Sequence, residues 1–80
     1  MGRLLLDEGA KEALLKRKSL LAVGVKKVKG SFAKGEVCEL ALEGEAPFAV
    51  ARAKYSSDQI SHQDRAKNME IAHADEIVLL

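Results

Sequence analysis

The chain has 80 residues, 48% of them hydrophobic and 4% aromatic, with a formal net charge of +1. That composition is too apolar for a disordered segment and allows one small domain with an aliphatic core. No apolar stretch is long enough to span a membrane, so we expect no membrane partner. The single Cys38 cannot form an internal disulfide, and we therefore expect a reducing, cytoplasmic location.

The charges are divided unevenly along the chain. Residues 1–35 hold nine Lys or Arg against three Asp or Glu, whereas residues 36–80 hold four against nine. A basic half and an acidic half suggest two faces with different partners. The alternative is that the two halves interleave in the fold and their charges cancel.

The first eighteen residues predict a strand followed by a helix. Arg3–Leu6 is a short apolar run typical of a strand. Asp7 is a residue type that caps helices, and Glu8–Arg17 carries its apolar residues at helical spacing. The basic run Lys16–Lys18 has the charge that a helix C-terminus favours, so we place the helix end there.

Three further strands are expected in the middle of the chain. Ser19–Gly24 is interpreted as a connecting loop, and Val25–Gly30 as a strand whose inward residues are spaced for a bulge or an edge position. Glu36–Leu42 has the most regular alternation of apolar and polar residues. A turn at Gly44–Pro47 then leads into the return strand Phe48–Tyr55.

The last third predicts a short helix and two short strands. Ser56–Ile60 begins with serines that can cap a helix, and the polar Ser61–Asn68 is expected to be a loop. Met69–His73 and Glu76–Leu80 are apolar runs compatible with strands. The resulting order, β-α-β-β-β-α-β(β), predicts a mainly β fold with short helices, a partly closed barrel with helices at its ends.

The sequence indicates no catalytic, metal or nucleotide site. Gly24–Ser31 superficially resembles a phosphate-binding loop, but Lys29 precedes Gly30 where that motif requires a lysine after its second glycine. The possible metal ligands His62, His73, Cys38 and Asp75 match no zinc spacing. We therefore expect no bound metal, no cofactor and no catalytic residue in this chain, which alone is not expected to be an enzyme.

Basic residues between positions 16 and 29 are the functional candidate that the residues themselves offer. The candidate contact residues are Lys16, Arg17, Lys18, Gly24, Lys26, Lys27 and Lys29. A glycine-bearing loop beside a basic helix end could hold a phosphate backbone. The other interpretation is a solvated helix end and an edge strand protected by lysines. Scarce aromatics disfavour stacking of single strands, whereas recognition of structured RNA by shape needs none.

Five motifs occur in one order along nearly the whole chain. They are D-x-G-A-x-x-A-L at Asp7–Leu14, K-S-L-L-x-x-G-V at Lys18–Val25, V-x-G-x-F-x-x-G-E-V at Val28–Val37, Y-S-S at Tyr55–Ser57 and H-x-D-x-[IL]-V-L at His73–Leu79. Each motif alone is weak, but five in register are specific. With them the sequence resembles a PUA domain, and more closely the C-terminal PUA domain of glutamate 5-kinases.

The resemblance implies a PUA pseudo-barrel over residues 1–80 that is an accessory or regulatory part of a larger enzyme. That enzyme uses ATP and Mg²⁺ to convert L-glutamate to L-glutamyl 5-phosphate, the first step of proline biosynthesis. Its amino-acid kinase domain would precede Gly2 and would be the partner of this domain, in a homo-oligomeric parent. The alternative implied by the same resemblance is an RNA-binding module, stand-alone or on an RNA-modifying enzyme, with Ser19–Val25 contacting structured RNA.

Overall fold

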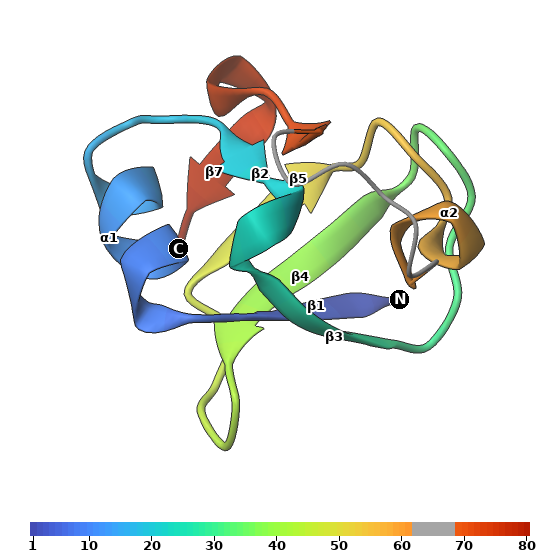
Figure 1. Ribbon diagram of the computed structural model, residues 1–80, viewed down its shortest axis with the longest axis horizontal. Coiled ribbons are helices and arrows are strands. Elements are labelled where there is room, and N and C mark those ends of the chain that lie inside the picture. The colour runs from blue at the N-terminus through green and yellow to red at the C-terminus, as the bar shows by residue number, and fades with distance from the viewer. Residues whose placement is uncertain (62–68) are drawn as a thin grey trace.

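The computed structural model describes residues 1–61 and 69–80 (Figure 1). These residues contain seven short strands, two helices and two 3₁₀ turns, joined by loops. The strands are β1 (Arg3–Leu6), β2 (Leu20–Leu21), β3 (Val25–Lys29), β4 (Val37–Leu42), β5 (Ala49–Arg52), β6 (Glu70–Ala72) and β7 (Ile77–Leu79). The helices are α1 (Glu8–Leu15) and α2 (Ser57–Ser61), and the 3₁₀ turns are Ala22–Gly24 and Ala74–Glu76. No helix among these residues is long and apolar enough to cross a membrane.

Five of the strands form a mixed sheet in the order β3-β1-β4-β5-β7. β1 runs parallel to β4, and the other neighbours in this sheet are antiparallel. β2 and β6 form a separate antiparallel pair. Figure 1 shows α1 and α2 at opposite sides of the strands. The predicted mainly β fold with short helices is therefore confirmed.

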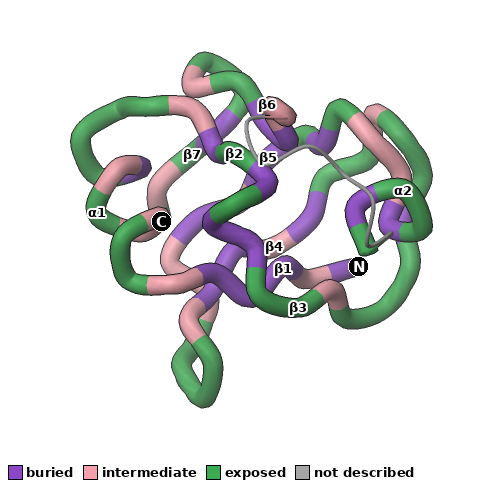
Figure 2. Tube along the Cα trace, in the orientation of Figure 1, coloured by how far each residue is buried: buried purple, intermediate pink, exposed green. Residues whose placement is uncertain are grey.

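The core is built from the inward residues of the alternating strands. Leu4 of β1 lies opposite Leu40 of β4, and both are fully buried. The next strand, β5, presents Ala49 and Ala51 to the core, where they pair with Leu40 and Cys38 of β4. Figure 2 shows buried stretches along the central strands and also on β2 and α2. Burial among them raises the pKa of the Cys38 thiol to about 11.

Helix α1 begins as the sequence predicts but ends earlier. The Asp7 carboxylate caps it by accepting the Ala10 N–H at 2.7 Å. The helix ends at Leu15, with Lys16 at the C-cap, whereas the prediction extended it to Arg17. Arg17 has a φ of 65°, in the left-handed region, and this conformation ends the helix. The basic run therefore follows the last helical turn instead of occupying it.

β3 lies at the edge of the sheet and carries the predicted bulge. Leu5 pairs with Lys27 and Leu6 with Val25, so the pairing skips Lys26. Val25 is buried, and β1 is the one neighbour of β3 in the described sheet. Both features expected from the spacing of the inward valines are present.

The interpretation of Ser19–Gly24 as a loop is wrong. It contains β2, in which Leu20 pairs with Ala72, followed by the 3₁₀ turn. The Ala22 N–H donates to the Met69 carbonyl at 2.8 Å and extends this pairing. A two-residue strand is too short to show alternation, and its partner lies about fifty residues further along the chain.

Helix α2 is capped as predicted. The Ser56 hydroxyl accepts the Gln59 N–H at 3.3 Å, and the Gln59 side chain accepts the Ser56 N–H at 2.9 Å, which is a capping box. The loop expected at Ser61–Asn68 lies outside the described residues except for Ser61, which is the last residue of α2.

Candidate nucleic-acid interface

A groove of about 450 Å³ lies between α1 and the segment formed by β2 and its 3₁₀ turn. Small residues of the helix, Gly9, Ala10 and Ala13, line one side. Leu21 and Val23 line the other side and remain exposed to solvent. The groove is thus mainly apolar and can receive a flat or apolar group.

The groove has its shape because the chain passes very close to the helix at Gly24. A Cβ atom on Gly24 would lie 2.5 Å from the Cβ of Ala10, which is closer than two carbons can come. The Gly24 carbonyl accepts the Asp7 N–H at 3.0 Å and fixes this approach. Gly24 therefore serves first to pack the turn against α1, and it lines the groove at the same point.

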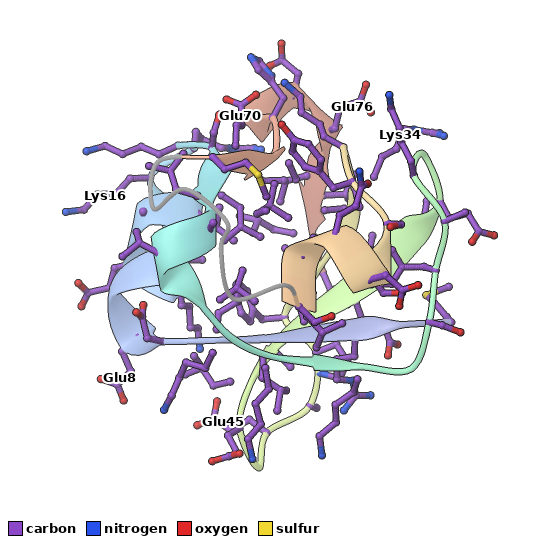
Figure 3. All side chains as sticks on the ribbon, turned by 45° about the vertical axis from the view of Figure 1, so that its right-hand side comes forward. Glu8, Lys16, Lys34, Glu45, Glu70 and Glu76 are labelled. Carbon is purple, nitrogen blue, oxygen red and sulfur yellow. The ribbon has the colours of Figure 1, made fainter. Side chains whose placement is uncertain are left out.

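Two charged residues line the groove, Lys18 and Asp7. The Asp7 carboxylate is committed to the helix cap, so Lys18 is the cation that a ligand in the groove would meet. Lys16 and Arg17 precede it and are exposed, and Figure 3 shows Lys16 extending outward beside α1. We call Lys16, Arg17 and Lys18 the helix-end cations.

The other predicted contact residues lie elsewhere. Lys26, Lys27 and Lys29, the edge-strand lysines, are on β3, which runs antiparallel to β1. Lys29 pairs with Arg3, three residues before Leu6, so this group extends away from α1 along the sheet edge. The structure thus divides the predicted basic cluster into two groups, and of all its members only Lys18 and Gly24 line the groove.

The edge-strand lysines lie on β3 at the edge of the sheet, as the alternative interpretation of an edge strand protected by lysines requires. The Lys27 ammonium contacts the Glu43 carboxylate at 3.4 Å, and both side chains are largely exposed. Because Lys27 lies opposite Leu5, this ion pair passes over an apolar residue of β1. Lysines on an edge strand discourage pairing with another chain, so they have a use that requires no ligand.

Ser19 connects the groove wall formed by β2 to β6 and to the 3₁₀ turn that follows β6. The Ser19 hydroxyl accepts the Ala74 N–H at 3.1 Å and also donates to the Glu70 carboxylate. Hydrogen bonding from Lys54, and then from Ser19, holds the pKa of Glu70 below its ordinary value. These contacts hold β2 in place beside β6 and so fix the wall opposite α1.

Val23 is a groove residue at a variable position of the Lys18–Val25 motif, and Leu21 occurs in that motif without being proposed as a contact residue by itself. The run Leu20-Leu21-Ala22-Val23 is apolar on both faces, although only Leu20 and Ala22 are buried. An apolar run with one exposed face is the signal that could have identified the groove wall. Across residues 1–61 and 69–80 no three His, Cys, Asp or Glu side chains come together in a way that could hold a metal ion.

A five-stranded mixed sheet, a separate strand pair and two short helices define a small, mainly β domain. The PUA domain family model matches residues 2–74, and the chain belongs to this family. A PUA domain from Aeropyrum pernix, solved as a tartrate complex, superimposes with a TM-score of 0.78 at 31% identity, covering 90% of this chain and 41% of that one. A PUA domain protein from Thermoplasma acidophilum gives 0.70 at 25% identity, covering 89% and 47%.

Curated relatives that match this chain are glutamate 5-kinases. That of Dictyoglomus turgidum is 44% identical over 72 residues, covering 86% of this chain and 19% of the relative. That of Thermus thermophilus is 41% identical, covering 88% and 19%, and that of Pelobacter propionicus is 36% identical, covering 99% and 25%. The chain therefore spans a quarter or less of the length of these relatives.

Proposed function

We propose that this chain is the accessory PUA domain of a glutamate 5-kinase. The observation that carries the proposal is the 44% identity to such a kinase over 86% of the chain. The proposal places the transfer of phosphate from ATP to L-glutamate, with its Mg²⁺, in an amino-acid kinase domain that precedes Gly2. These residues then act on assembly of a homo-oligomeric, cytoplasmic enzyme or on its inhibition by proline.

The experiment begins with the reading frame upstream of Gly2. We expect it to encode an amino-acid kinase, and a frame without one would contradict the proposal. The full-length enzyme and a variant that lacks residues 2–80 are then compared for glutamate-dependent ATP turnover. We expect turnover to persist in the truncated enzyme, with a changed oligomeric state or a changed response to proline.

We also propose RNA binding as a second candidate function. It is supported by the position of Lys18 in an apolar groove, with Lys16 and Arg17 beside it. Cations at this position would contact backbone phosphates while the groove receives an unpaired part of the RNA. On this proposal the edge-strand lysines lie outside the contact.

Separation of the two basic groups provides a matched test for RNA. Lys16→Glu with Lys18→Glu should abolish a gel shift with structured RNA, and Lys26→Glu with Lys29→Glu should affect it much less. Removing one lysine–phosphate interaction should make the slope of log K against log salt shallower by about 0.9. No salt-dependent shift for the unmodified chain, or equal losses of affinity for both variants, would rule out this function.

A further inference from the structure

The two edges of the five-stranded sheet differ in protection. β3, at one edge, carries three lysines and a bulge, which are devices that prevent strand pairing. β7, at the other edge, reads Ile77-Val78-Leu79 and is followed by Leu80, with no charge, proline or bulge. Among the described residues β5 is the one neighbour of β7. The apolar edge of β7 is therefore suited to pairing with another strand.

The backbone of β7 presents hydrogen-bonding groups on its outer side. The Leu80 N–H donates to the Phe48 carbonyl at 2.9 Å, so Leu80 and Val78 turn their backbone groups toward β5. By alternation, Ile77 and Leu79 turn theirs away from the sheet. The Ile77 N–H already donates to the Ala74 carbonyl in the 3₁₀ turn. The outward groups are then the Leu79 N–H and the carbonyls of Ile77 and Leu79.

An apolar surface adjoins this edge on the outer face of the sheet. Val78 is 60% exposed and pairs with Val50, and Val37 lies near them on β4. These valines line a shallow depression of about 150 Å³ that we call the valine hollow, together with Ala51, Arg52, Asp75 and Glu76. Leu80, 77% exposed, lies two residues beyond Val78 on the same face.

We propose that β7 pairs antiparallel with β7 of a second copy of this chain, about a twofold axis at Val78. The strand is self-complementary in this arrangement, because its three central residues carry no charge and Val78 meets Val78. Leu80 of each copy comes opposite Glu76 of the other and covers the valine hollow beside it. Glu76 keeps its contact with Arg52, 3.5 Å away, so no like charges are placed opposite each other.

The pairing uses the outward groups symmetrically. Each Leu79 N–H donates to the Ile77 carbonyl of the second copy, which gives two hydrogen bonds across the axis. Two five-stranded sheets then become one continuous sheet, with the lysine-bearing β3 strands at its two outer edges. The unprotected edges are both removed, and the protected edges remain exposed.

The test compares two valines of nearly equal exposure. Val78→Lys places two like charges opposite each other at the axis, and Val23→Lys makes the same change at a valine that is 62% exposed on the 3₁₀ turn. Sedimentation velocity of the 80-residue chain, up to near-millimolar concentration, should show association from 8.7 kDa to twice that mass. Val78→Lys should weaken this association by about tenfold or more, and Val23→Lys should leave it unchanged. Circular dichroism confirms that both variants are folded.

Cross-linking gives a second measurement that does not depend on a destabilising charge. Residues at the axis are a non-hydrogen-bonded pair with Cα atoms about 4.5 Å apart, within the range of a disulfide. Val78→Cys should therefore form a covalent dimer on mild oxidation much faster than Val23→Cys. A wild-type chain that stays monomeric at the highest concentration would overturn the proposal, as would equal responses at the two positions.

Discussion

Ser57 is the one buried polar side chain among the residues that the structure describes. Its hydroxyl accepts the Phe32 N–H at 3.0 Å and lies 3.2 Å from the Phe32 carbonyl, to which it donates. The Ser57 N–H donates to that same carbonyl at 2.9 Å. A single residue at the start of α2 thus satisfies the N–H and the carbonyl of Phe32, which lies between β3 and β4.

Ser57→Ala should lower the free energy of unfolding by about 1–3 kcal/mol, because the Phe32 N–H is left buried without its acceptor. Urea unfolding followed by circular dichroism measures this loss. Ser61→Ala in the same helix removes a hydroxyl that, among the described residues, donates to the Ser57 and Asp58 carbonyls, and its effect should be small. Equal losses for both variants would contradict the role assigned to Ser57.

Glu70 should make stability depend on pH. Its pKa is lower in the folded chain than in the unfolded chain, because Lys54 and Ser19 donate hydrogen bonds to its carboxylate. The ionised Glu70 carboxylate therefore stabilises the fold at pH values above the ordinary pKa of a glutamate. This contribution disappears as the pH falls through the lowered pKa of the folded state. Glu70→Gln should be less stable than wild type at neutral pH, with the difference closing in acid.

Chemical unfolding at a series of pH values measures this dependence. Glu45→Gln, at an exposed glutamate in the turn between β4 and β5, provides the matched control and should show no comparable convergence. A constant difference between Glu70→Gln and wild type from neutral to acid pH would exclude the ionised carboxylate as its source.

At the scale of elements, the contact between α1 and the 3₁₀ turn Ala22–Gly24 decides whether the groove exists. The helix presents Ala10 and the turn presents Gly24, and no larger pair fits between them. The same contact holds the Gly24 carbonyl against the Asp7 N–H, so helix cap and turn are fixed together. A change in either element should therefore alter the groove and the stability together.

Gly24→Ala should destabilise the fold by about 1–3 kcal/mol, because the new methyl group overpacks against Ala10. Thermal and urea unfolding measure the loss, and the double variant with Ala10→Gly should recover part of it. Gly9→Ala is the control within α1, where the added Cβ meets nothing closer than 3.5 Å. It should stabilise the helix by up to about 1 kcal/mol, and a loss as large as that of Gly24→Ala would contradict this account.

The elements that could be predicted are those whose apolar pattern indicates which residues are buried. Glu36–Leu42 and Arg3–Leu6 alternate or run apolar, and Asp7 marks a helix start, so β4, β1 and α1 were expected within one or two residues. β2 could not be predicted, because two residues show no period and their pairing is with β6. The early end of α1 follows from the φ of Arg17, a conformation rare for arginine and not indicated by its sequence.

At the scale of the molecule, Cys38 reports on the cooperativity of the whole sheet. It lies in β4, fully buried at the centre of the five strands. Burial raises its pKa to about 11, so little thiolate exists near pH 8. Burial also keeps reagents away from the sulfur. A reagent can reach this sulfur only when the central strands separate.

We expect the native thiol to resist a disulfide reagent such as DTNB at pH 8 and to react at once in denaturant. Its labelling rate should rise in parallel with the unfolded fraction that circular dichroism measures. Fast labelling of the folded chain would show that β4 opens locally, contrary to its position in the core.

The candidate site could be predicted only in part for a reason that belongs to the whole molecule. Lysines 16 to 29 are neighbours in sequence, but β3 leads Lys26, Lys27 and Lys29 away from the helix end. Leu21 and Val23 form one wall of the groove, and this wall is in place because β6 pairs with β2 and holds it beside α1. The sequence shows that these basic residues are close together along the chain. Which of them lie on the same surface follows only from the fold.

The parallel pairing of β1 with β4 has a consequence for synthesis on the ribosome. Arg3 bonds to Glu39, 36 positions later, so the leucines of β1 have no sheet partner on the β4 side until that strand has emerged. β3 can form a hairpin-like contact with β1 earlier, but the core closes only when β5 and β7 follow. The nascent chain therefore cannot complete its five-stranded sheet until β7 has been synthesised.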